Sequence, residues 1–269
     1  MSSVTSISTS AVLPTFNVGS MGGSVPVGTS IMGLLILFIL AGGLLLLLGT
    51  LVIVHAVLRP PRTTFAEALA IDAPTDPGDL QLDYTVWACR TADGLDLPAW
   101  DVVGASGGPT LIWLHDHGRS RICDLSDIEY WLGWCGRVVL VDLRGHGDAD
   151  GACTLGQRER DDIDRLIDHV QAEQLILAGR GFGALLAVDA AQRHDDIAVW
   201  GIEPRGDATD EIASALRSNH LPAWPLSGLT VSVASMLGCR PMQPVSAASE
   251  QRVRIVDAGA ALPEGPWWP

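Results

Sequence analysis

The sequence predicts an α/β domain, with a mostly parallel sheet flanked by helices, that is preceded by one transmembrane helix. The first observation is the apolar run from Ile31 to Leu58, which exceeds the roughly 20 residues that a helix needs to cross the hydrocarbon core. The second is that short apolar segments alternate with amphipathic ones through the rest of the chain. This order is typical of a parallel sheet covered by helices.

The composition of the chain divides it into four parts. Residues 1–30 are rich in Ser, Thr and Gly and are expected to form a disordered polar tail. Residues 31–58 are the predicted transmembrane helix, residues 59–80 a Pro-rich linker, and residues 81–269 the α/β domain. A cleaved signal peptide is the alternative for the apolar run, but it needs a positively charged start and an apolar core of about 7–15 residues. The sequence has neither feature.

Positive charge follows the apolar run on one side only. Arg59 and Arg62 come directly after it, whereas no Asp, Glu, Lys or Arg occurs from Met1 to Leu58. Segments on the cytoplasmic side of a membrane helix carry the excess of Lys and Arg. We therefore expect a single-pass protein that contacts the lipid bilayer through Ile31–Leu58, with its domain in the cytoplasm.

Hydrophobic patterning locates the elements of the domain. The expected strands are Leu82–Arg90 and Leu97–Val103 as an antiparallel pair, then Thr110–His115, Val138–Val141, Leu175–Ala178, Ala198–Ile202 and Val253–Val256. The expected helices are Ile122–Gly133, Leu155–Ala172, Phe182–Gln192 and Ala208–Ser218.

Charge and cysteine content exclude two classes of function. The chain has 31 acidic and 17 basic residues, a formal net charge of −14, which disfavours binding to nucleic acid phosphates. Its five cysteines are odd in number and have no CxxC spacing, so we expect thiols in a reducing compartment, without a disulfide framework or a zinc site.

Three strand ends carry patterns that together resemble the α/β-hydrolase superfamily, in its lipase, esterase and aminopeptidase-like branch. They read LHDHGRSR after the first parallel strand, VDLRGHGDADG after the second and LILAGRGFGALLA at the third. The resemblance implies that the first pattern shapes an oxyanion hole, the second forms a turn, and the third is the nucleophile elbow. The elbow has the pattern G-x-S-x-G.

The chain departs from the family pattern at the catalytic positions. Gly181 stands where the family has its nucleophilic serine, and Asp116 follows His115 where the family has Gly. A carboxylate there opposes the negative charge that an oxyanion hole stabilises. The N–H of Phe182 could still point into the hole. No histidine follows His220, so the resemblance implies that the catalytic histidine is missing and the domain is truncated at its C-terminus.

Other polar residues near these strand ends have structural interpretations. Ser120 is expected to cap the next helix rather than to act as a nucleophile. His146 and Asp142 are expected to shape a turn. His115 and His117 lie in one short loop and lack a distant fourth ligand, so the sequence predicts no metal site.

These observations predict a membrane-anchored pseudoenzyme of the α/β-hydrolase type, which needs no cofactor. Three roles stay open for it: binding of an acyl or peptide-like ligand, interaction with another protein at the membrane, or no task, as a decayed paralogue. The first alternative is an active ester or amide hydrolase that uses other residues. The second is a dinucleotide-binding protein, because Gly179, Gly181 and Ala184 fit the loose glycine fingerprint and Glu203 ends the next strand.

Overall fold

The computed structural model describes residues 27–62, 65–104, 107–204, 206–218, 220–240, 242 and 253–256. The chain divides into two compact units, residues 1–45 and residues 46–269. Most of the predicted tail lies outside the described residues, as does the segment that follows the last strand.

Helix α1 extends over Val27–Leu58 and therefore begins before the predicted start at Ile31. Within it, Ile31–Leu58 is long and apolar enough to cross a membrane, with a mean hydropathy of 2.9. Its large apolar side chains from Ile31 to Leu48 are exposed. Farther along, Thr50, Val54 and Val57 are buried, and these last turns of α1 are part of the second unit.

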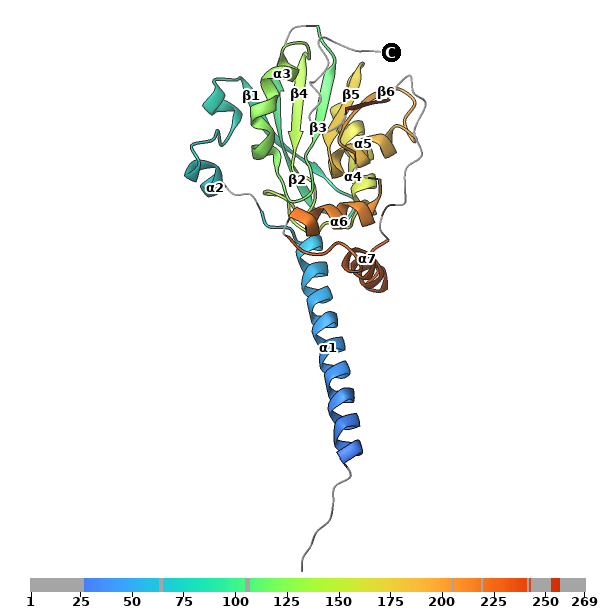
Figure 1. The fold of residues 1–269 in the computed structure, drawn as a ribbon. Helices are drawn as coiled ribbons and strands as arrows, with labels where there is room; N and C mark the ends of the chain where they lie inside the picture. Colours follow the sequence, from blue (N-terminus) through green and yellow to red (C-terminus); the bar gives the residue numbers. More distant parts are fainter. Residues whose placement is uncertain are drawn as a thin grey trace, which may run out of the picture. The chain divides into compact units, whose positions relative to one another are not determined.

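Seven strands of the described residues form one sheet in the order β1-β2-β4-β3-β5-β6-β7 (Figure 1). Strands β1 and β2 are antiparallel to their neighbours, and the pairs from β4 through β7 are parallel, as predicted. The strands are β1 (Tyr84–Arg90), β2 (Asp96–Val103), β3 (Thr110–Leu114), β4 (Arg137–Val141), β5 (Leu175–Arg180), β6 (Ile197–Ile202) and β7 (Val253–Val256).

The sheet separates two hydrophobic layers because alternate side chains of each strand point to opposite faces. Ile112 and Leu114 of β3 pack in the same cluster as the apolar residues of α4, α5 and α6, together with Val57 of α1. Leu111 and Trp113 pack on the other face, against η2 and α3. The helices of the domain are α2 (Phe65–Ala70), α3 (Ile128–Leu132), α4 (Glu159–Val170), α5 (Phe182–Ala190), α6 (Ala208–Ser218) and α7 (Leu226–Met236), with the 3₁₀ helices η1 (Pro77–Leu80) and η2 (Arg121–Asp127).

Several element boundaries differ from the prediction. The expected linker at residues 59–80 contains α2 and η1, and Asp76 accepts hydrogen bonds from Gly78 N–H and Asp79 N–H at the start of η1. The expected helix Ile122–Gly133 is divided between η2 and α3. The expected helix from Leu155 begins at Glu159, because Leu155 and Gly156 have left-handed backbone angles that no helix accepts.

Candidate functional site: a nucleophile elbow without its serine

The turn between β5 and α5 has the geometry of a nucleophile elbow. Gly181 joins the two elements with φ 54° and ψ −112°, and its N–H donates to the carbonyl of Ile202, 2.9 Å away. Gly179 and Gly183 flank it, and a Cβ on either would collide with backbone atoms. Close approach of the helix to the strand thus requires small residues on both sides of position 181, as in the G-x-S-x-G pattern.

The Asp116 carboxylate occupies the space above Gly181. Strands β3 and β5 are adjacent, with Leu114 paired to Gly179, so the residues after them meet at one edge of the sheet. Asp116 Oδ1 accepts the N–H of Phe182 and the N–H of His117, each at 2.8 Å. A Cβ at Gly181 would overlap the same carboxylate.

This arrangement places an internal anion where a hydrolase would bind the negative oxygen of its intermediate. The N–H that follows the nucleophile position is one of the two donors of the oxyanion hole in this fold. Here that donor, Phe182 N–H, is already hydrogen-bonded to a carboxylate of the same chain. The site therefore lacks a hydroxyl at position 181, and Asp116 occupies the oxyanion donor that Phe182 would supply.

His115 has a structural role. It is fully buried, and its Nε2 accepts the N–H of Leu143 at 3.0 Å. The other ring nitrogen, Nδ1, therefore carries the proton and donates to the carbonyl of Asp116 at 2.8 Å. These two bonds connect the loop after β3 to the loop after β4 and fix the backbone of Asp116.

Asp142 shapes the turn of the second pattern. Its carboxylate accepts the N–H of Arg121 and the N–H of Asp148, and it pairs with the Arg121 guanidinium at 2.7 Å. Farther along the turn, Arg144 pairs with Asp162 at 2.5 Å, and both side chains are buried. These bonds support the structural interpretation of this turn.

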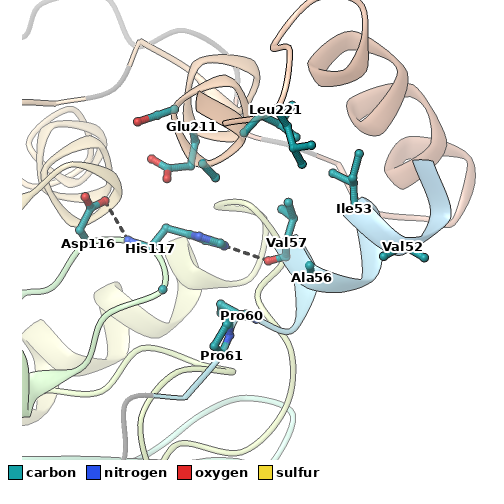
Figure 2. A pocket seen from close by; sticks show the side chains of 14 residues that line it. Val52, Ile53, Ala56, Val57, Pro60, Pro61, Asp116, His117, Glu211 and Leu221 are labelled. Atoms are coloured by element: carbon teal, nitrogen blue, oxygen red, sulfur yellow. Dashed lines mark hydrogen bonds between the residues drawn. The ribbon is translucent and has the colours of Figure 1, made fainter. Parts of the chain in front are cut away.

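The pKa values of two histidines beside the elbow are lowered, which favours the neutral imidazole. Burial lowers the pKa of His117, and burial together with the neighbouring His115 and His117 lowers the pKa of His146 well below its usual value. His117 Nε2 donates to the carbonyl of Val57 in the last turn of α1, 2.8 Å away (Figure 2). The N–H of Cys153 donates to the next carbonyl, that of Leu58, at 2.9 Å.

A cavity of about 440 Å³ adjoins this edge of the sheet. Figure 2 shows Ile53 and Val57 of α1 on one side of it, and Glu211 and Leu221 on another. Asp116 and His117 also line it, so the cavity connects the elbow region to the end of the apolar helix.

The other residues that the sequence analysis considered for catalysis or metal binding include Ser120 and the cysteines. Ser120 holds the position before η2, but its hydroxyl makes no capping bond and instead lies 3.7 Å from Cys123 Sγ. The five cysteines are free thiols in the structure. Burial raises the pKa of Cys135 to about 12, so that thiol is unreactive.

The residues of the dinucleotide-binding alternative, Gly179, Gly181 and Ala184, have the expected spacing, but the turn offers no free N–H groups at Gly181 and Phe182. A pyrophosphate is held by unoccupied N–H groups at a helix start. The N–H of Gly181 is bonded to Ile202 and that of Phe182 to the Asp116 carboxylate. The geometry therefore opposes an anion at this turn.

No protein-family model and no curated protein sequence matches the chain. Among solved structures, it is similar to an esterase from Pyrococcus furiosus. In one crystal form of that esterase the identity is 23%, the match covers 70% of this chain and 71% of that chain, and the TM-score is 0.52. In a second form the identity is 24%, the covered shares are 66% and 71%, and the TM-score is 0.50. Together with the parallel sheet and the elbow, this similarity shows that the chain has the α/β-hydrolase fold.

Proposed function

We propose that this chain is a membrane-anchored protein of the α/β-hydrolase fold that binds an acyl-type ligand and does not hydrolyse esters or amides. The observation that carries the proposal is the Asp116 carboxylate, which is bonded to Phe182 N–H above Gly181. This carboxylate fills the space that the serine side chain would need. It also accepts the hydrogen bond of Phe182 N–H, which would otherwise stabilise the reacting oxygen.

The exposed surface of α1 supports anchoring in a membrane. Contiguous exposed apolar side chains over many turns are rare on soluble proteins. The residues from Ile31 to Gly49 would extend over about 28 Å, close to the thickness of the hydrocarbon core. The end of the helix supports its retention, because Val57 belongs to the domain core and the Leu58 carbonyl accepts the N–H of Cys153. A cleaved leader would leave both contacts unmade.

We place the domain on the cytoplasmic side because Arg59 and Arg62 follow the helix and no charge precedes it. Protease added to intact cells is expected to spare the domain, and protease added to inverted vesicles is expected to digest it. Both samples should keep the chain in the pellet after carbonate extraction. Digestion in unbroken cells would reverse the orientation, and release by carbonate would contradict anchoring.

The cavity supports an acyl-type ligand. The walls formed by α1 and by Leu216 and Leu221 are apolar. The part of α1 that lines the cavity, residues 52–57, is its last two turns. The polar end contains Asp116 and Glu211, and the Glu211 residue is only 4% exposed. Two carboxylates beside one cavity disfavour an anionic head group. We therefore assign an apolar chain with an uncharged head rather than a free fatty acid.

Filling the cavity should release this ligand. Ala215 lines the cavity from α6, whereas Arg217 on the same helix is exposed and lies outside it. Full-length protein purified in a mild detergent is expected to carry a co-purifying lipid-like molecule by native mass spectrometry. The ligand should be lost in Ala215→Trp and kept in Arg217→Trp. Equal occupancy in both variants, or none in the wild type, would contradict a ligand in this cavity.

A further inference from the structure

Three potential metal ligands from two loops, the one after β3 and the one between β4 and α4, meet beside the end of α1. His117 follows β3, His146 follows β4, and Cys153 lies in the segment before α4. One ligand atom from each of these residues lies within 4.8 Å of the others. The sequence gives no sign of this cluster, because His117 lies 29 or more positions before the other two residues and none of the three pairs has a recognised ligand spacing.

Each imidazole presents a lone pair because a backbone carbonyl fixes its tautomer. A carbonyl can only accept, so His146 Nδ1 donates to Arg144 O at 2.9 Å and its Nε2 is left with the lone pair. His146 is 1% exposed, and this Nε2 has no hydrogen-bond partner among the residues that the structure describes. His117 Nε2 donates to Val57 O in the same way, which leaves the lone pair on Nδ1.

This is the arrangement by which proteins prepare histidines for metals. A ligating imidazole usually donates its other ring N–H to a carbonyl or carboxylate, which fixes the ring and makes the ligating nitrogen more basic. A buried ring nitrogen that makes no hydrogen bond destabilises the folded protein, so its presence needs a cause. A thiol sulfur beside two imidazole nitrogens is a donor set for zinc or another borderline-soft divalent metal.

We propose that the imidazoles of His117 and His146, together with Cys153 Sγ, bind one divalent transition metal ion, such as zinc. Bonds of about 2.0–2.3 Å imply ligand atoms roughly 3.3–3.8 Å apart in a tetrahedral site, so the side chains close by about 1 Å on binding. Three protein ligands leave a fourth position for water or for a ligand atom. On binding, the Cys153 thiol releases its proton to solvent.

The metal would also fix the end of the membrane helix. His117 holds the Val57 carbonyl through its side chain, and the Cys153 N–H holds the Leu58 carbonyl. Joining these two residues through one ion therefore braces both contacts at once. His117 also lines the cavity, but the test of the metal site does not depend on the acyl-type ligand, because it changes Cys153 and His146, which are not among the cavity-lining residues.

Cobalt substitution tests the site in the detergent-solubilised full-length protein. After removal of metals, titration with Co²⁺ is expected to give a thiolate-to-cobalt charge-transfer band and the visible bands of a tetrahedral ion, at one ion per chain. Both sets of bands should vanish in Cys153→Ser. In His146→Gln, the affinity of the protein for Co²⁺ should fall at least tenfold. Cys135→Ser, which removes another buried thiol, should leave them unchanged.

A second measurement keeps the test decisive if a variant folds poorly. Added zinc should raise the melting temperature of the wild type and of Cys135→Ser, but not that of Cys153→Ser. A wild type without the charge-transfer band overturns the proposal. So does a band that persists in Cys153→Ser or disappears in Cys239→Ser, since the sulfur ligand would then lie elsewhere.

Discussion

Replacing Gly181 with serine is expected to destabilise the domain by about 3 kcal/mol instead of creating an active nucleophile. The new Cβ would overlap the Asp116 carboxylate, which must then move away. Movement breaks its bonds to Phe182 N–H and His117 N–H. For a domain of roughly 200 residues, this loss lowers the melting temperature by roughly 6–12 °C.

Gly118→Ser is the matched control for this substitution. Gly118 also has a positive φ, 73°, but a Cβ there meets nothing within 4 Å. It therefore reports the backbone cost of the serine alone, about 1 kcal/mol. An equal loss of stability in Gly181→Ser and Gly118→Ser would show that Asp116 does not occupy the serine's space.

The conflict between the two positions should appear as a coupling energy. Asp116→Gly removes the carboxylate that the serine would displace, so the double variant with Gly181→Ser should be less destabilised than the sum of the two singles. We expect a difference of about 2 kcal/mol, which chemical denaturation of the four proteins measures. Strict additivity would contradict direct contact between positions 116 and 181.

Much of the fold could be predicted because its central strands are short, continuous apolar runs. Thr110–His115 and Val138–Val141 read as strands buried on both faces, and β3 and β4 are at those positions. Helix α7, at Leu226–Met236, was missed because its residues have no apolar stripe and include β-branched side chains. The linker contains η1 because Asp76 caps it, a local signal that the surrounding prolines obscured.

Some features of the candidate site could be read from local sequence motifs, and others depend on tertiary packing. A glycine at position 181 and a carboxylate at position 116 could be read from motifs, and their proximity followed from adjacent strand ends. The bond from His117 N–H to Asp116, and the docking of Val57 against His117, depend on how separate segments pack. The cluster of His117, His146 and Cys153 could not be predicted, because no spacing in the sequence encodes the approach of the loop after β3 to the loop between β4 and α4.

We expect this protein to show no covalent reactivity with serine-hydrolase probes, and this is its largest expected difference from an active hydrolase. Enzymes typically accelerate their reactions by about 10⁶-fold or more, so an active serine hydrolase and an inert protein differ far beyond experimental error. Gly181 has no hydroxyl to attack an acyl or phosphonyl group. The Asp116→Gly variant should be equally inert, because clearing the oxyanion region supplies no nucleophile.

Fluorophosphonate labelling of the full-length protein, read by intact mass and peptide mapping, tests this account most directly. An active serine hydrolase in the same tube serves as the positive control. We predict no adduct on the wild type and no ester turnover above that of heat-denatured protein. A stoichiometric adduct on any serine, or turnover that Asp116→Asn abolishes, would show that the site is an active hydrolase and contradict the proposed function.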